Sequence, residues 1–195
     1  MKNHANLYLC CLLLLLTAFS CKKEQTEPDC PAPCYSQYDV PGLPPVTASG
    51  AGTAGFLLNG EPWVAEGSIP GGLPGPVFAA YDEVTGFLEV KINKFSNIEG
   101  YEINQRFIFD ISSAYEENRS YEITQGNALW SNYNDECNYP FSSLVQNNNS
   151  VQIISLNKEE NFVSYLFSCT LIQEECPNDT IKITNGRVDT NYLPY

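Results

Sequence analysis

The sequence predicts an all-β domain, a single antiparallel β-sandwich of about eight to ten strands, with a small closed β-barrel as the alternative. Short apolar runs separated by turn residues follow one another from Gly55 onward. Within the runs apolar and polar residues alternate, and no stretch sustains a helical period of about 3.6 residues. Alternation assigns one face of each strand to a core, but it does not say whether the sheet closes, so both architectures stay open.

The first two runs form a predicted hairpin. Residues 56–58 and 63–65 flank the dipeptide Asn59-Gly60, which supplies the two positive φ angles of a type I′ turn. Trp63, in the second run, is expected to fill core, because large aromatic side chains usually do. A loop rich in glycine and proline follows over residues 67–76.

The later runs predict the remaining strands. The alternation places one face of each in the core, and the run at 163–172 is apolar enough on both faces to be central. A second Asn-Gly pair, Asn185-Gly186, predicts a turn between residues 181–183 and the closing strand 187–192. The other expected strands are 77–81, 88–92, 107–111, 128–133 and 151–153.

The start of the chain has the layout of an export signal. A short polar start precedes the apolar run Leu7–Leu16, which is shorter than the roughly 18–20 residues that span a bilayer and therefore predicts a cleaved signal peptide. Ala18 and Ser20 are small residues that suit cleavage before Cys21. The segment resembles a bacterial lipoprotein signal, in which the cysteine after the cut is lipidated. A plain secreted protein cut at the same bond is the alternative.

These features divide the chain into three parts. Residues 1–20 are the predicted lipoprotein signal peptide, 21–53 a tether rich in proline and glycine, and 54–195 the β-sandwich domain. Proline blocks regular ladders and favours extended chain, so the predicted tether is a spacer that holds the domain off the membrane.

The net charge, and the lack of histidine after the predicted signal, exclude several classes of function. Removing residues 1–20 takes away Lys2 and no acid, so nine basic and 23 acidic residues remain, with a net charge of −14. This charge opposes binding to nucleic acid and to anionic lipid surfaces. The single histidine, His4, lies in the signal. The mature chain therefore has no Ser-His-Asp or Cys-His catalysis and no histidine-ligated zinc, whereas catalysis by carboxylates alone stays possible.

An exported chain can form disulfides, and five cysteines follow Cys21. Because five is odd, at least one is free or pairs between molecules. Cys30 and Cys34 can close a small loop in the tether, and Cys137 can pair with Cys176, since both lie in loop-like sequence. Cys169 falls in mid-strand, where a free thiol packs as a small apolar side chain.

Three further positions are candidate sites. Trp130 and Tyr133 can form a stacking platform for a sugar, with core packing as the alternative. Thr180 lies in Asp-Thr-Ile, which resembles the O-glycosylation motif of Bacteroidota. The acidic and amide residues at 132–136 do not have the spacing of a calcium loop, so no metal site and no cofactor are predicted.

Two motifs bracket the predicted domain. F-x-x-N-G-x-x-W at residues 56–63 and I-T-N-G-R-V-D at residues 183–189 resemble the opening and closing motifs of a Bacteroidota lipoprotein domain family of unknown function. The resemblance implies no catalytic residues. In a strand Arg187 and Asp189 share one face and can pair.

Together these observations predict a non-enzymatic, lipid-anchored protein of the outer membrane, facing either the periplasm or the cell exterior. Its expected role is binding or structural, with a glycan or another envelope protein as partner, and the membrane is contacted through the lipid. The alternative from another class is a carboxylate-dependent polysaccharide hydrolase, which needs two acids about 5–10 Å apart in a cleft.

Overall fold

The computed structural model describes residues 36–67, 75–98, 101–114, 116–123, 128–132, 141, 143–144, 149–173 and 180–195. The all-β prediction is confirmed, because this part of the chain forms strands and no α-helix. Its elements are the short 3-10 helix η1 (Ser36–Tyr38) and the strands β1 (Ala51–Leu58), β2 (Glu61–Val64), β3 (Val77–Asp82), β4 (Phe87–Ile98), β5 (Tyr101–Ile111), β6 (Ser120–Glu122), β7 (Ala128–Asn132), β8 (Ser143–Leu144), β9 (Ser150–Asn157), β10 (Phe162–Ile172) and β11 (Thr180–Pro194).

The described strands form one open sheet of eleven strands, so the closed barrel is not the architecture. Its order is β6-β9-β10-β11-β3-β4-β5-β7, with β1 joining β11 to β2 and β8 pairing with β10. One pairing corrects the prediction of a purely antiparallel sheet. The end of β11, Tyr192–Pro194, runs parallel to β3. These residues lie beyond Thr190, which pairs with the first residue of β1, Ala51. This edge of β11 is therefore open to β3.

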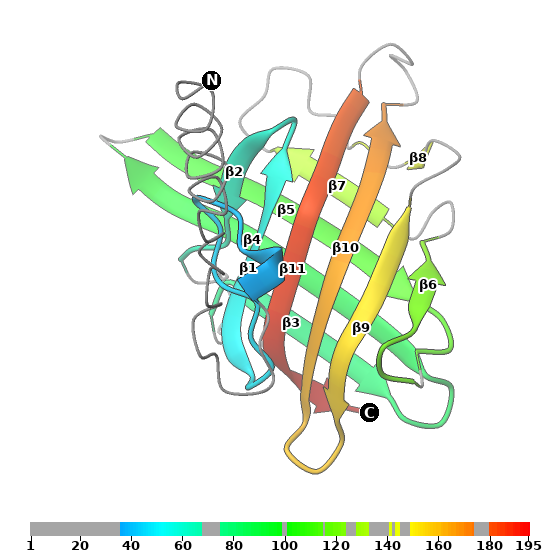
Figure 1. The fold of residues 1–195 in the computed structure, drawn as a ribbon. Coiled ribbons are helices and arrows are strands. Elements are labelled where there is room, and N and C mark those ends of the chain that lie inside the picture. The colour runs from blue at the N-terminus through cyan, green and yellow to red at the C-terminus, as the bar shows by residue number, and fades with distance from the viewer. Residues whose placement is uncertain are drawn as a thin grey trace, which may run out of the picture. The chain divides into compact units, whose positions relative to one another are not determined.

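The sheet folds into two layers. In Figure 1, β9, β10 and β11 cross over the layer made of β3, β4, β5 and β7. Aromatic rings fill the space between them: Phe56 stacks on Trp63 at 4.4 Å between ring centroids, and Phe107 of one layer stacks on Phe167 of the other at 5.4 Å. Each such pair contributes about 0.5–1.5 kcal/mol beyond its buried area.

The predicted alternation is confirmed in the long strands. Leu166 and Ile172 of β10 lie half-buried on the outer face, as expected. The inward residues are at most 4% exposed, namely Leu88, Val90, Ile92, Phe107, Phe109, Ile111, Val163, Tyr165, Phe167, Cys169 and Leu171.

The predicted hairpin is also confirmed. Asn59 and Gly60 have φ angles of 52° and 94°, as a type I′ turn requires, and they connect β1 to β2. The resulting register places Phe56 opposite Trp63. The opening motif is therefore a hairpin that presents two stacked rings to the core, and Trp63, 4% exposed, fills core as expected.

The second Asn-Gly pair does not form the predicted turn. β11 continues through Asn185 and Gly186, and only Asn185 has a positive φ, 52°. The two residues lie opposite a single residue of β1, Phe56, and the register against β10 shifts at the same place. The pair forms a β-bulge, in which one extra residue is absorbed without ending the strand.

The predicted boundary between the tether and the domain, after residue 53, lies too far along the chain. Contacts divide the chain between Cys34 and Tyr35, and the second unit, 35–195, includes η1 and the segment 39–50. The backbone of this segment is bound by side chains of β11, so the domain begins well before residue 54.

Candidate functional site

The β-bulge in β11 determines which side chains reach the outer face of the sheet. Before it, Ile181 and Ile183 point into the core, whereas after it the core positions are Val188 and Tyr192. One extra residue shifts the alternation by one position. Arg187, which would otherwise share the inward phase of Ile183, is thereby placed on the outer face.

Asp189 binds the N-terminal segment through a set of hydrogen bonds that we call the clasp, made with residues 47–51. Its carboxylate accepts from the backbone N–H groups of Ser49 (3.1 Å), Gly50 (2.8 Å) and Ala51 (3.3 Å). The hydroxyls of Thr47, at 2.6 Å, and Ser49, at 3.2 Å, donate to it as well. Asp189 is 2% exposed. A buried carboxylate is stable when its oxygens are hydrogen-bonded in this way.

Arg187 lies two residues earlier on the same face, but the two do not form the expected ion pair. Among the described residues no ion pair includes Arg187. Its guanidinium donates to the carbonyl oxygens of Asn185, at 3.3 Å, and Pro44, at 3.2 Å. Burial lowers the pKa of Arg187, and the negative charge of Asp39 opposes that shift.

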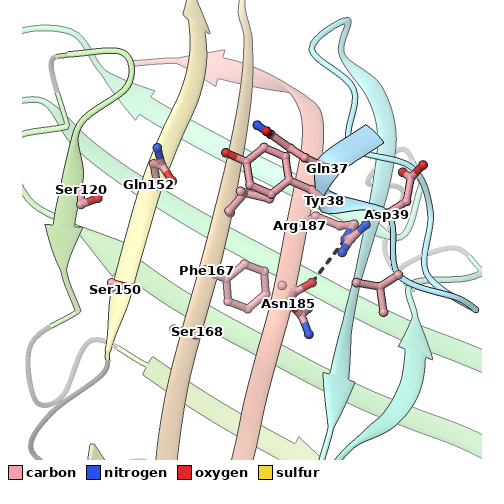
Figure 2. A pocket seen from close by; sticks show the side chains of 13 residues that line it. Gln37, Tyr38, Asp39, Ser120, Ser150, Gln152, Phe167, Ser168, Asn185 and Arg187 are labelled. Carbon is pink, nitrogen blue, oxygen red and sulfur yellow. Dashed lines mark hydrogen bonds between the residues drawn. The ribbon is translucent and has the colours of Figure 1, made fainter. Parts of the chain in front are cut away.

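Arg187 lines a groove of about 350 Å³ on the outer face of the sheet. We define the groove by the walls seen in Figure 2. Tyr38, from η1, forms one side; Ser120 and Gln152, from β6 and β9, form the opposite side; and β10 and β11 form the floor. The volume lies within the range of about 300–1,000 Å³ that is usual for small-molecule sites.

The groove combines one partly exposed aromatic ring, that of Tyr38, with side chains that donate and accept hydrogen bonds. Tyr38 is half-buried. Amides come from Gln37, Gln152 and Asn185, hydroxyls from Ser120, Ser150 and Ser168, and apolar contacts from Val40 and Leu166. Amides and hydroxyls match ligands that carry several hydroxyls of their own.

Gly186 lets β11, which forms part of the floor of the groove, pack over the core ring of Phe167. A Cβ atom at this position would lie 2.5 Å from the ring of Phe167, which is opposite Gly186 in the register and 4% exposed. Only a residue without a side chain leaves room for that buried ring.

The predicted stacking platform is corrected for Trp130. This residue is 2% exposed, and its ring packs edge-on against Trp63 with centroids 5.5 Å apart. A ring buried on both faces offers no surface to a sugar, so Trp130 is a core residue, and Tyr133 lies outside the described residues. Thr180 is exposed at the start of β11, and its glycosylation stays a prediction.

Cys169 is a free thiol and 2% exposed, as expected. Burial raises its pKa to about 12, which keeps the sulfur protonated and unreactive. Cys21 and the disulfide candidates Cys30, Cys34, Cys137 and Cys176 lie outside the described residues.

Sequence reasoning missed the groove because its walls come from distant segments. Tyr38 lies in the predicted tether, and Gln152 had no distinguishing pattern. The sequence feature closest to the groove was the Arg-x-Asp pair of the closing motif, because Arg187 lines the groove.

Within the described ranges, no cluster of three or more histidine, cysteine or acidic side chains is arranged to hold a metal. In the same residues we find no helix with the length and apolar character needed to cross a bilayer. Comparison of the chain with protein-family models, with curated proteins and with solved structures finds no match.

Proposed function

We propose that this protein is a lipid-anchored, non-enzymatic module of the outer envelope that binds a glycan in the groove. Attachment through Cys21 rests on the sequence, as does the location at the outer membrane, facing the periplasm or the exterior. Membership of the Bacteroidota lipoprotein family stays a prediction.

The observation that carries the proposal is the chemistry of the groove. A sugar ring has hydroxyls around its edge and apolar C–H faces above and below. Tyr38 offers a ring to such a face, and Gln152 and Asn185 offer amides to the hydroxyls. An aromatic surface with a few convergent polar groups is typical of a ligand site.

The carboxylates support binding over hydrolysis. Asp39 is the only acidic residue among the described residues that line the groove, whereas a glycoside hydrolase of this type needs two acids. Glu89 and Asp110 do face each other across β4 and β5. They lie on the other layer of the sheet, and neither lines the groove.

The clasp supports a tethered arrangement. Asp189 fixes residues 49–51 on the domain, so a chain that enters from the N-terminal side is held at one place on the outer face.

A glycan array and calorimetry with the full-length chain test this function. We expect binding to at least one saccharide, and we expect Tyr38→Ala to weaken it about tenfold, or about 1.4 kcal/mol. Tyr195→Ala is the matched control, because Tyr195 is a tyrosine that is 65% exposed outside the groove.

Absence of saccharide binding would overturn the proposal, and capture of one envelope protein that Tyr38→Ala abolishes would replace glycan with protein as the partner. Release of reducing sugar from a polysaccharide would favour the hydrolase. The lipid part is tested separately: wild-type cells should incorporate a clickable fatty acid into the protein, and Cys21→Ala cells should not.

A further inference from the structure

Arg187 is the only basic residue among the described residues that line the groove. It is 3% exposed. A guanidinium has five N–H donors, and the structure records two hydrogen bonds from it, both to uncharged backbone carbonyls. Three donors are therefore left over, and the positive charge has no ion-pair partner among the described residues.

A buried charge without a counter-charge is costly. Asp39 acts on Arg187 only at longer range, and its side chain is exposed to solvent. No other acidic side chain in the described residues lines the groove. The site thus presents a fixed positive charge with donors to spare, beside groups suited to sugar hydroxyls.

The planar guanidinium fork matches anionic groups that carry two or more oxygens, and pairs with them bidentately. We propose that the groove takes an acidic sugar, whose carboxylate or sulfate group pairs with Arg187 while its ring lies against Tyr38. This inference rests on the proposed function and narrows its ligand class from glycans in general to anionic ones.

The net charge of the chain makes this a specific prediction. At −14 for the mature chain, the long-range field repels anions, so any preference for an acidic sugar must come from a local contact. Arg187 is the local contact that the described residues provide.

Calorimetry with the full-length chain distinguishes the cases. The probes are a galacturonic acid trimer, a sulfated galactose trimer and the neutral galactose trimer. We expect one acidic trimer to bind at least tenfold more tightly than the neutral one. Arg187→Gln should abolish that preference, and Arg187→Lys, which keeps the charge but loses the fork, should retain only part of it.

Asp39→Asn keeps the inference testable if the Arg187 variants fail to fold, as judged by circular dichroism. Asp39 is exposed, so the substitution should leave the fold intact. Removing its charge should raise the ratio of acidic to neutral affinity about threefold, in line with a screened interaction near the surface. An unchanged or lower ratio would contradict the inference.

The failures of the two proposals are distinguishable. Equal binding of acidic and neutral trimers, weakened together by Tyr38→Ala, would overturn the acidic-sugar inference and leave the glycan function standing. Failure to bind any saccharide would overturn both. Binding of free sulfate or acetate, which carry no sugar ring, as tightly as the trimers would show a general anion site and overturn the assignment to a saccharide.

Discussion

Two buried charges lie two residues apart on the same face of β11, and they differ in how many hydrogen bonds they make. Asp189 of the clasp accepts hydrogen bonds from five donors. Arg187 of the groove makes two hydrogen bonds, both to neutral oxygens. Their exposures are almost equal, 2% and 3%, so burial alone does not separate them. The difference lies in hydrogen bonding. Both carboxylate oxygens of Asp189 accept hydrogen bonds from within the domain, as expected for a structural group, whereas Arg187 has N–H donors left that a bound ligand can use.

The largest expected effect tests the clasp. Asp189→Ala leaves three backbone N–H groups near Ser49, Gly50 and Ala51 without an acceptor. Gly50 is half-buried, whereas Ser49 and Ala51 are exposed, so water can replace part of the lost hydrogen bonding. An unsatisfied buried donor costs about 1–3 kcal/mol. We therefore expect the free energy of unfolding measured in urea to fall by about 2–4 kcal/mol, with new proteolytic cleavage within residues 36–50.

Asp82→Ala is the control for this prediction. Asp82 also accepts from a hydroxyl and backbone N–H groups, those of Thr85 and Val84, but in an exposed turn where water replaces them. Its effect should be much smaller. Equal losses in the two variants would show that the clasp contributes nothing special.

The next effect tests the packing beneath β11, the strand that carries both Asp189 and Arg187. Gly186→Ala places a methyl group against the buried ring of Phe167, and overpacking of this kind costs about 1–3 kcal/mol. Thermal unfolding measures it. Thr184→Ala, on the same strand, is the matched control and should lose less; the reverse order would refute the packing argument.

A smaller effect is expected when the groove charge is removed. Arg187→Met replaces a buried charge that has no counter-ion by an apolar side chain of similar length. Relief of the desolvation cost of the lone charge opposes the loss of its hydrogen bonds to the carbonyls of Asn185 and Pro44. Water can reach both carbonyls, because Pro44 is half-buried and Asn185 is exposed. We therefore expect a change in unfolding free energy of less than about 1 kcal/mol, together with loss of acidic-sugar binding. A loss as large as that of Asp189→Ala would make Arg187 structural and erase the contrast.

The smallest effect concerns Asp110, a partly exposed carboxylate that has neither five hydrogen-bond donors around it, as Asp189 has, nor the burial of Arg187. Burial, and then the negative charge of Glu89, raise the pKa of Asp110, while Lys91 opposes the shift. A raised pKa in the folded state means that stability is full below the unfolded pKa and falls as the pH rises through the folded pKa.

Asp110→Asn should therefore stabilise the protein at pH 7 and not at pH 3, by less than about 0.5 kcal/mol because the site is partly exposed. Asp82→Asn should behave oppositely. Its pKa is lowered by hydrogen bonds from Thr85 and Val84, so the stability it contributes is present at neutral pH and is lost as the pH falls. Unfolding curves at the two pH values measure both; the same sign for both variants would contradict the assignment.

The fold could be predicted where local pattern and tertiary structure agree. The alternation in 88–92, 107–111 and 163–172 placed the correct residues in the core, and Asn59-Gly60 formed the expected turn. The same dipeptide at Asn185-Gly186 failed as a prediction. There the neighbouring strands β1 and β10 continue past it on both sides, and their hydrogen bonds keep β11 extended.

By itself, the sequence determined the all-β class, the core faces of the long strands and the opening hairpin, because these depend on periodicity and turn chemistry within a few residues. Only the tertiary structure decided that residues 36–53 belong to the domain, that Trp130 is buried, and that Arg187 and Asp189 do not pair. Each of these depends on which distant segment lies against β11: residues 44–51 supply carbonyl and N–H groups to the two charges, and no local pattern records that contact.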